Sequence, residues 1–421
     1  MKQTPILFLS DSPSCSSGLG RITRELSMRL HERCPDIFRV ATLGYGGPGS
    51  CSIPFQQYCI EGMHNWFIPT IKQVWEDFAG DEPGVIFTIW DASRLLWFAR
   101  PAEYRENKYI RDWLINAPFK RWGYIPIDAA GPNNQLSCMI KECLLGYDQL
   151  LAYTNWGDDL IRSTIGDQEN IGNLPHGIDT DVFSADSNKS KSRQIFRDIL
   201  GFKGPEFRKD EILVGIVATN QDRKDYGFAI HMLAELSQKI PIRIFIQTDM
   251  LERRWSIPAL LSDYGLLANA IVNCAEIDDS TMAMIYSACD VTLGIGLGEG
   301  FGFPIFESLA CGTPCITGSY GGQAEFMDKQ MLVKPEMFRL EGLYNCIRPV
   351  YSRKAWIRAI EDTLRMVRAG RLNFALPAEL DWKNLWVSWE AWFREAHASL
   401  TVKEPEEVNA PNNSNVVPFV K

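Results

Sequence analysis

Short apolar runs alternate with stretches of helical periodicity along most of the chain. A helix is predicted from about Arg21, because Ile22, Leu26 and Leu30 fall on one face. Repeated strand–helix alternation indicates parallel sheets with helices on both faces, which is an α/β fold. The runs predicted as strands are residues 5–10, 39–43, 85–89, 122–127 and 149–153, then 212–218, 242–247, 270–274, 291–293 and 314–317.

A polar segment, Ser184–Arg193, interrupts this alternation near the middle of the chain and predicts a domain boundary. A helix expected at Gln194–Leu200 would open the second half. We therefore expect two doubly wound domains, with a ligand at the carboxyl ends of strands that face the cleft between them. The predicted parts are residues 1–185, residues 186–375, an aromatic helix at 376–400 and a tail at 401–421 that is expected to be disordered.

In the aromatic helix, Trp382, Trp386, Trp389 and Phe393 recur at helical spacing. This spacing favours packing of the helix against a domain over a platform for a ligand.

Length and charge narrow the function classes. A chain of 421 residues exceeds what one core usually serves. Its net charge of −9 disfavours wrapping of nucleic acid or of an anionic membrane, although a local basic patch could serve either. Eleven cysteines without zinc-site spacing indicate reduced thiols. We expect no signal peptide and no membrane-spanning run, hence a cytoplasmic protein.

The segment Glu299–Glu307 carries two carboxylates eight positions apart with glycines between them. Pro304 suits the first position of a helix, which places Glu307 in the first turn and Glu299 in the loop before it. The free N–H groups and positive dipole end of a helix N-terminus attract phosphate. A phosphorylated, hydroxyl-rich ligand such as a nucleotide sugar fits this pattern. The alternative is an exposed loop acid followed by an acid that the helix dipole favours.

Three other segments are candidates for the same site. Arg223 and Lys224 follow a predicted strand and could neutralise a diphosphate, or could be solvated loop residues. Gly18 and Gly20 follow the first strand and would let backbone approach a ligand, but Thr23 stands where a dinucleotide fingerprint needs a third glycine. Asp128 ends another strand and either faces the reacting centre or begins a turn.

Residues 277–290, 299–307 and 318–325, taken in order, resemble the donor-site signature of retaining glycosyltransferases with the GT-B architecture, in particular glycosyltransferase family 4. The resemblance implies that Glu299 contacts hydroxyls of the donor sugar and that Glu307 holds the ribose. It also implies that the backbone N–H groups of Gly300, Phe301, Gly302 and Phe303 lie along the sugar and phosphate. Related enzymes often carry a His or an Asp near the reacting centre at the end of this strand, and Asp128 could there orient the acceptor or the sugar.

The resemblance implies a nucleotide-diphosphate sugar as co-substrate, with no cofactor and no metal. Related enzymes have a further arginine where Thr219 or Asn220 stands here. Either Arg223 takes over that role together with Lys224, or phosphate binding is weaker. The pair Asp179 and Asp181 is not expected to bind metal, because it lies beside a predicted hinge turn.

The acceptor is not identified by the sequence. The segment Ser17–Leu26 resembles bacteriophage glycosyltransferases, some of which modify DNA bases, but the acidic charge weighs against nucleic acid. The arginines of the following helix are interspersed with Glu25 and Glu32, so a membrane-binding face is ambiguous and a soluble or polymeric acceptor is favoured. A nucleotide-sugar 2-epimerase and a non-catalytic nucleotide-sugar-binding protein are the alternatives.

Overall fold

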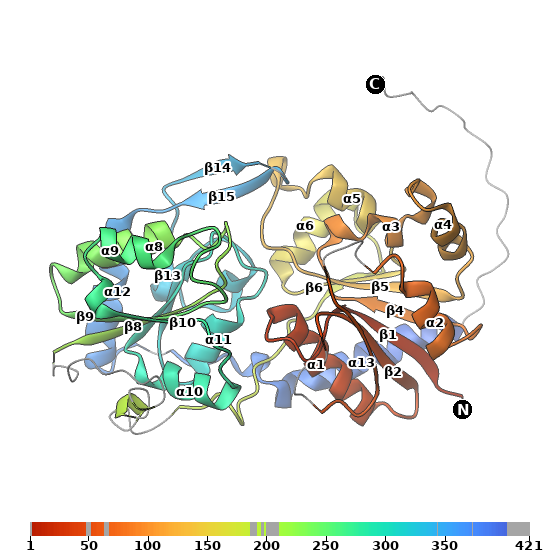
Figure 1. The fold of residues 1–421 in the computed structure, drawn as a ribbon, viewed down its shortest axis with the longest axis horizontal. Coiled ribbons are helices and arrows are strands. Elements are labelled where there is room, and N and C mark those ends of the chain that lie inside the picture. The colour runs from red at the N-terminus through yellow and green to blue at the C-terminus, as the bar shows by residue number, and fades with distance from the viewer. Residues whose placement is uncertain are drawn as a thin grey trace, which may run out of the picture.

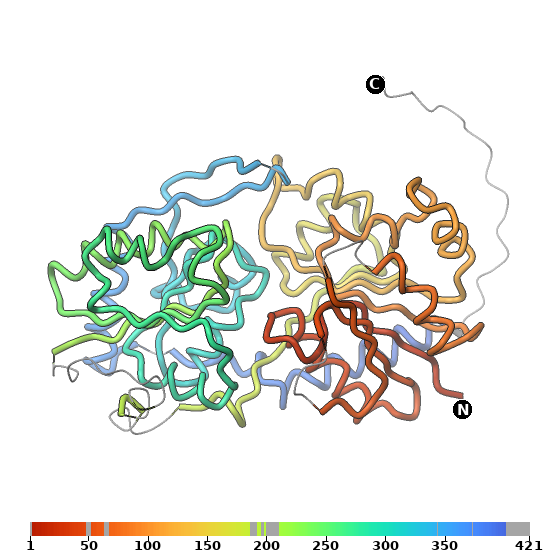
Figure 2. The backbone as a smooth tube through the Cα atoms, in the orientation of Figure 1, coloured from red at the N-terminus to blue at the C-terminus, as the bar shows by residue number. Residues whose placement is uncertain are grey.

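Two parallel sheets, one in each half of the chain, confirm the predicted α/β fold class (Figure 1). The computed structural model describes residues 2–47, 52–62, 67–185, 192–194, 198, 210–342, 344–372 and 374–401. The two halves lie side by side, and the backbone trace passes between them more than once (Figure 2). Most of the segment 194–200, predicted as a helix, and the tail 402–421 lie outside the described residues, and the predicted domain bounds stay predictions.

The first sheet has seven strands in the order β3-β2-β1-β4-β5-β6-β7, and its neighbouring strands pair in parallel. Its strands are β1 Thr4–Asp11, β2 Phe38–Tyr45, β3 Gln56–Ile60, β4 Gly84–Thr88, β5 Phe119–Ile125, β6 Gln149–Ala152 and β7 Ile171–Asn173. Its helices are α1 Gly18–Arg33, α2 Ile71–Phe78, α3 Leu96–Ala99, α4 Lys108–Ile115, α5 Cys138–Leu144 and α6 Asn155–Ile165.

The second sheet has six parallel strands in the order β10-β9-β8-β11-β12-β13. Its strands are β8 Ile212–Val217, β9 Ile242–Gln247, β10 Ala270–Asn273, β11 Val291–Gly294, β12 Cys315–Gly318 and β13 Leu332–Val333. Its helices are α8 Tyr226–Ser237, α9 Ile257–Asp263, α10 Asp279–Ala288, α11 Phe303–Ala310 and α12 Arg353–Arg368.

In each sheet the strand order reverses beside the first strand, between β1 and β4 and between β8 and β11. Loops at the carboxyl ends of these strands diverge there and leave room for a ligand. Gly18 begins the helix that follows β1, and the loops after β8 and β11 carry Arg223 and Glu299. The topology therefore gathers the predicted site residues at two switch points that belong to different domains.

Helix α1 begins three residues earlier than the apolar pattern predicts. Ser17 caps the helix, and its side chain accepts a hydrogen bond from the N–H of Gly20 at 3.0 Å. Serine is a preferred N-cap because its oxygen satisfies a backbone donor that has no partner inside the helix. The helix therefore starts at Gly18, before its first core-facing residue Ile22.

A two-stranded antiparallel hairpin of β14 Met337–Glu341 and β15 Cys346–Val350 was not predicted and belongs to neither large sheet. It leaves the second domain and reaches toward the first, across the top of the view in Figure 1. The strands β3, β7 and β13 were also missed, because β7 and β13 are only three and two residues long and β3 begins with two glutamines.

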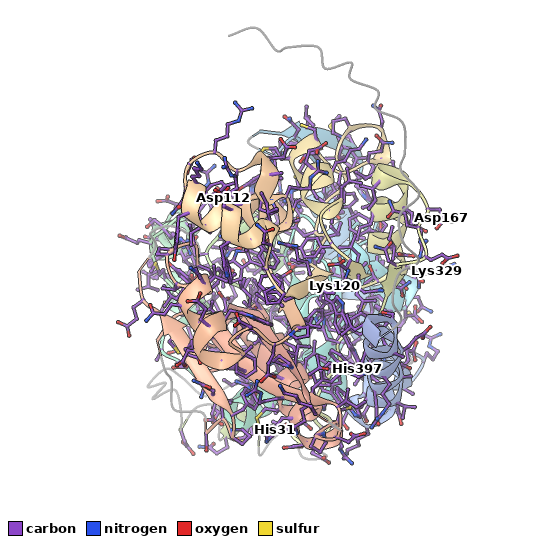
Figure 3. All side chains as sticks on the ribbon, turned by 90° about the vertical axis from the view of Figure 1, so that its right-hand side faces the viewer. His31, Asp112, Lys120, Asp167, Lys329 and His397 are labelled. Carbon is purple, nitrogen blue, oxygen red and sulfur yellow. The ribbon has the colours of Figure 1, made fainter. Side chains whose placement is uncertain are left out.

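The C-terminal helix α13, Trp382–Thr401, packs back on the first domain, as predicted. Trp389 is fully buried, its ring lies 5.0 Å from that of Tyr124, and its indole N–H donates to the carbonyl of Pro175 at 2.8 Å. His397 lies further along the same helix (Figure 3) and contacts the hydroxyl of Thr4 at 2.9 Å. The aromatic residues of α13 thus join the core around β1, β4 and β5.

The cysteines and the helices can be compared with what the composition predicted. The ten cysteines within the described residues are free. No helix in the described part of the chain combines the length and apolarity needed to cross a membrane.

Candidate active site

The loop between β11 and α11 carries the first acid of the motif. Gly302 caps the helix with a φ of +90°, a left-handed conformation that favours glycine, and the helix begins at Phe303. The predicted positions in this helix are wrong: Pro304 is the second residue and Glu307 the fifth, beyond the first turn. Pro304 still loses no hydrogen bond, because the first four N–H groups of a helix have no partner within it.

Glu299 is buried, with 7% of its surface exposed, between two cations from the loop after β8. Its Oε2 accepts a hydrogen bond from Arg223 Nη1 at 2.8 Å, and its Oε1 contacts the Lys224 ammonium. Burial by itself raises the pKa of Glu299, but the charges of Arg223 and Lys224 outweigh burial and hold the pKa at about 2. Glu299 is therefore ionised throughout the physiological range.

The two cations respond differently to the same surroundings. Burial lowers the pKa of Lys224, and the adjacent charge of Arg223 lowers it further, to about 8. Burial acts in the same direction on Arg223, but the carboxylates of Glu299 and Asp128 outweigh it and raise its pKa. Arg223 thus stays charged, whereas Lys224 titrates just above neutral pH.

Asp128, which follows β5 in the first domain, lies at this site. Its Oδ2 is 3.1 Å from Arg223 Nε, so Arg223 bridges carboxylates of both domains. The alternative prediction was that Asp128 begins a turn. A turn does follow, but it closes further along the chain, where the N–H of Gly131 donates to the carbonyl of Gln135 at 2.7 Å. The structure brings the four predicted catalytic candidates, Glu299, Asp128, Arg223 and Lys224, into one cluster of charges.

Glu307 belongs to a second cluster of charges, on the other side of the glycine-rich loop. The hydroxyl of Tyr286 donates to its Oε2 at 2.8 Å, and the guanidinium of Arg21 contacts its Oε1. The same guanidinium contacts Asp279 and lies 5.4 Å from the centre of the Phe303 ring. Glu307 is 4% exposed, so this contact from α1 ties the two domains together.

Sequence reasoning missed Arg21 as a partner of Glu307, noting it only as one of several arginines on its helix. No spacing signal links residues separated by 286 positions. Arg348 of the hairpin was missed for the same reason, and it lies beside Asp128, with Nη1 donating to the Asp128 carbonyl at 3.0 Å.

The predicted glycines lie close to different parts of the chain. A Cβ added to Gly18 would lie 3.8 Å from the Phe303 ring, so this glycine faces the first residue of α11. A Cβ on Gly20 would instead lie 2.7 Å from the carbonyl oxygen of Ser12, so Gly20 packs against the loop after β1. A Cβ on Gly300 would lie 3.1 Å from the carbonyl oxygen of Ile127, so the loop before α11 comes close to the first domain.

The rings of Phe301 and Phe303 pack on His176, with centroid distances of 3.9 and 4.6 Å. His176 is 1% exposed, its Nδ1 lies 3.0 Å from the Tyr124 hydroxyl, and burial lowers its pKa well below the usual value. These contacts make His176 a packing residue.

Thr219 and Asn220, in the loop after β8, stand where related enzymes have a further arginine. Asn220 is fully buried, and its side chain bonds the backbone of Met250 and Trp255. Thr219 is exposed. Asn220 therefore holds the loop in shape, and neither residue brings charge to the cluster around Glu299.

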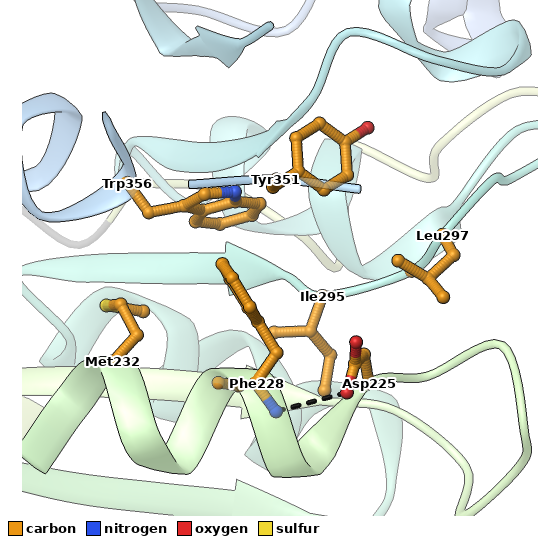
Figure 4. A pocket seen from close by; sticks show the side chains of 9 residues that line it. Asp225, Phe228, Met232, Ile295, Leu297, Tyr351 and Trp356 are labelled. Carbon is orange, nitrogen blue, oxygen red and sulfur yellow. Dashed lines mark hydrogen bonds between the residues drawn. The ribbon is translucent and has the colours of Figure 1, made fainter. Parts of the chain in front are cut away.

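A separate small cavity lies between α8 and the start of α12 (Figure 4). It is lined mainly by apolar side chains, including Phe228, Ile295, Leu297 and Trp356. Its volume of about 10 Å³ is room for one water molecule at most, so it is too small for a sugar.

Metal ligands were not expected from the sequence. Within the described residues, no three His, Cys, Asp or Glu side chains come together as a metal ion would require. Asp179 accepts a hydrogen bond from the N–H of Asp181 at 3.0 Å, and Asp181 pairs with Lys383. A metal-independent site stays a prediction.

Solved structures with both domains identify the architecture. Sucrose-phosphate synthase from Thermosynechococcus elongatus matches with a TM-score of 0.69 at 16% identity, over 94% of this chain and 100% of that chain. Anabaena HepE in complex with UDP and glucose matches with a TM-score of 0.61 at 16% identity, over 94% and 100%. The fold is GT-B.

Residues 211–353 match the family model described as "Glycosyl transferases group 1". D-inositol 3-phosphate glycosyltransferase of Mycobacteroides abscessus is 26% identical over 42% of this chain and 38% of that protein. The GDP-mannose-dependent alpha-(1-6)-phosphatidylinositol monomannoside mannosyltransferase of Mycolicibacterium smegmatis is 29% identical over 39% of this chain and 42% of that protein. The chain thus spans about two fifths of the length of these curated relatives.

Proposed function

We propose that this chain is a glycosyltransferase that moves a sugar from a nucleotide-diphosphate sugar to an acceptor, with retention at the anomeric carbon and without a metal. Within the glycosyltransferases we assign it to family 4. The second domain, which carries the match to the family model, binds the donor, and the acceptor approaches from the first domain.

The observation that carries this proposal is the group of buried Glu299 with the partly buried Arg223 and Lys224 at the switch point between β8 and β11. A carboxylate can accept hydrogen bonds from two sugar hydroxyls, and two cations can neutralise a diphosphate. Both ligand parts therefore find partners within one cluster, and the free N–H groups at the start of α11 lie beside it.

Donor binding then proceeds as an exchange of partners. Hydroxyls of the sugar replace Arg223 and Lys224 as donors to Glu299, and the released cations turn to the diphosphate. As the bond to the anomeric carbon breaks, negative charge grows on the leaving phosphate, and preorganised cations stabilise that charge most strongly where water is excluded. The acceptor hydroxyl attacks on the same face, and the leaving phosphate takes its proton.

Glu307 takes the ribose in this proposal. Its carboxylate is held by Arg21 in the ligand-free protein, so nucleotide binding replaces an ion pair by hydrogen bonds to the ribose hydroxyls. Because Arg21 belongs to the first domain, the same exchange loosens one contact between the domains.

The test is to incubate the protein with UDP-, GDP- and ADP-sugars and to follow nucleotide release with and without candidate acceptors, including a soluble oligosaccharide and modified DNA. Release that rises with an acceptor supports the proposal. An epimerised sugar without acceptor would instead identify a nucleotide-sugar 2-epimerase. Binding seen by thermal shift without turnover would identify a non-catalytic binding protein. Full turnover by Glu299→Ala would refute the proposed donor site.

A further inference from the structure

The hairpin of β14 and β15 connects the two domains at the edge of the Glu299 cluster. The N–H of Ile347 in β15 donates to the carbonyl of Ala130 in the first domain at 2.7 Å. The hydroxyl of Tyr320 accepts from the N–H of Ala130 at 2.9 Å and donates to the carbonyl of Ile347 at 2.6 Å. Both backbone groups of Ala130 are therefore bonded to the second domain, directly after Asp128 and Ala129.

Arg348, the next residue of the hairpin, lies directly against Asp128. Its Nη1 donates to the Asp128 carbonyl at 3.0 Å, and its Nη2 is 3.6 Å from the Asp128 carboxylate. On its other side, its Nε donates to Glu341 of β14 at 2.9 Å. The Arg348 side chain is 8% exposed, so its guanidinium is nearly removed from water and depends on these partners.

The loop that carries Glu299 closes this group. Gly298 has a φ of +142°, and a Cβ added there would lie 2.1 Å from the Asp128 carbonyl oxygen and 2.9 Å from Arg348 Nη1. Asp128, Arg348 and the loop that carries Glu299, which is the donor loop of the proposed function, are therefore in contact without space between them. Arg348 and Arg223 both contact Asp128, and Arg223 also contacts Glu299. A shift of Arg348 would therefore change the position of Asp128 relative to Glu299.

We propose that the β14–β15 hairpin is a strap between the domains and that Arg348 is a positioning residue, which holds Asp128 against the donor loop in the geometry for transfer. This rests on the proposed function, in which Asp128 faces the reacting centre. Arg348 acts through Asp128, by charge and by the hydrogen bond to its carbonyl. A planar guanidinium can make both contacts at once, whereas a lysine ammonium makes them less well.

The hairpin supplies its own control. Arg339 of β14 is the cross-strand neighbour of Arg348, and it is exposed. Arg339→Gln removes the same charge from the same hairpin without touching Asp128. Wild type is compared with Arg348→Gln, Arg348→Lys and Arg339→Gln. Each variant is first checked for a thermal unfolding midpoint of the second domain that equals the wild-type midpoint.

Two readouts are measured on the full chain: kcat and donor KM for transfer, and amide hydrogen exchange of peptides that contain Ala130 and Ile347. We expect Arg348→Gln to lower kcat about 100-fold, the loss typical of a misplacement near 1 Å, with a much smaller change in donor KM. Exchange at Ala130 and Ile347 should become faster. Arg348→Lys should recover part of kcat, and Arg339→Gln should match wild type in both readouts.

Equal kcat and equal exchange in Arg348→Gln and Arg339→Gln would overturn the inference. Faster exchange with unchanged kcat, or a rise in KM alone, would overturn the positioning role. A wild-type chain that turns over no nucleotide sugar contradicts the proposed function instead. The rate of amide hydrogen exchange at Ala130 then tests by itself whether the hairpin is a strap between the domains.

Discussion

Replacing Glu299 by glutamine keeps the shape of the side chain but removes the charge between Arg223 and Lys224. The folded-state pKa of about 2, against an ordinary value of 4.5, gives the magnitude. The difference is 4.5 − 2 = 2.5 units, and each unit corresponds to about 1.4 kcal/mol. The ionised carboxylate therefore stabilises the folded protein by about 3 kcal/mol, in the range found when one partner of a buried ion pair is removed.

The sign of the pH dependence follows from the same values. Because the folded pKa is depressed, this stabilisation is fully present above pH 4.5 and is lost as the pH falls toward 2. Between pH 5 and pH 3 the wild type should lose about 2 kcal/mol from this group, by the linkage relation. Glu299→Gln should lack that component of the pH dependence, because glutamine does not titrate.

The assay is urea unfolding followed by tryptophan fluorescence at pH 7, 5 and 3, alongside transfer activity at pH 7. Glu235→Gln is a matched control, since Glu235 pairs with Arg353 on the surface, and it should behave as wild type. Loss of one preorganised contact to the reacting donor should lower kcat by about 100-fold or more. A Glu299→Gln variant as stable as wild type at pH 7, with the same loss on acidification, would refute the reasoning.

Three further outcomes are expected. The rate of sugar transfer should fall as the pH rises above about 8, where Lys224 loses its proton, and Lys224→Arg should remove that decline. A wild-type rate that stays constant up to pH 10 would contradict this expectation. Arg21→Ala should lower the unfolding free energy by about 3 kcal/mol, because buried Glu307 loses its cation. Arg24→Ala removes a longer contact to Asp279 and should lower it by less, so equal losses in calorimetry would contradict this expectation. Trp389→Ala should cost about 3 to 5 kcal/mol by opening a cavity under α13, and an unchanged melting temperature would show that the helix packs elsewhere.

Local chemistry explains why the central elements were predictable. A buried parallel strand needs a continuous apolar run, so β1 and β8 stand out in the sequence within one residue of their observed ends. The glycines before α11 and the proline inside it also marked the helix start, although the helix begins at Phe303, one residue before Pro304. The hairpin strands are only five residues long, and the apolar residues of β14 are exposed, so the sequence did not mark the hairpin as part of a core.

The sequence by itself determined that acids, cations and glycines follow particular strands, and parallel topology then requires those strand ends to meet at one edge of each sheet. Only the tertiary structure decided which charges of the two domains pair. Arg21 reaches Glu307 and Arg348 reaches Asp128 through the packing of one domain on the other. Such contacts depend on the relative position of two rigid bodies, and no periodicity along the chain records that position.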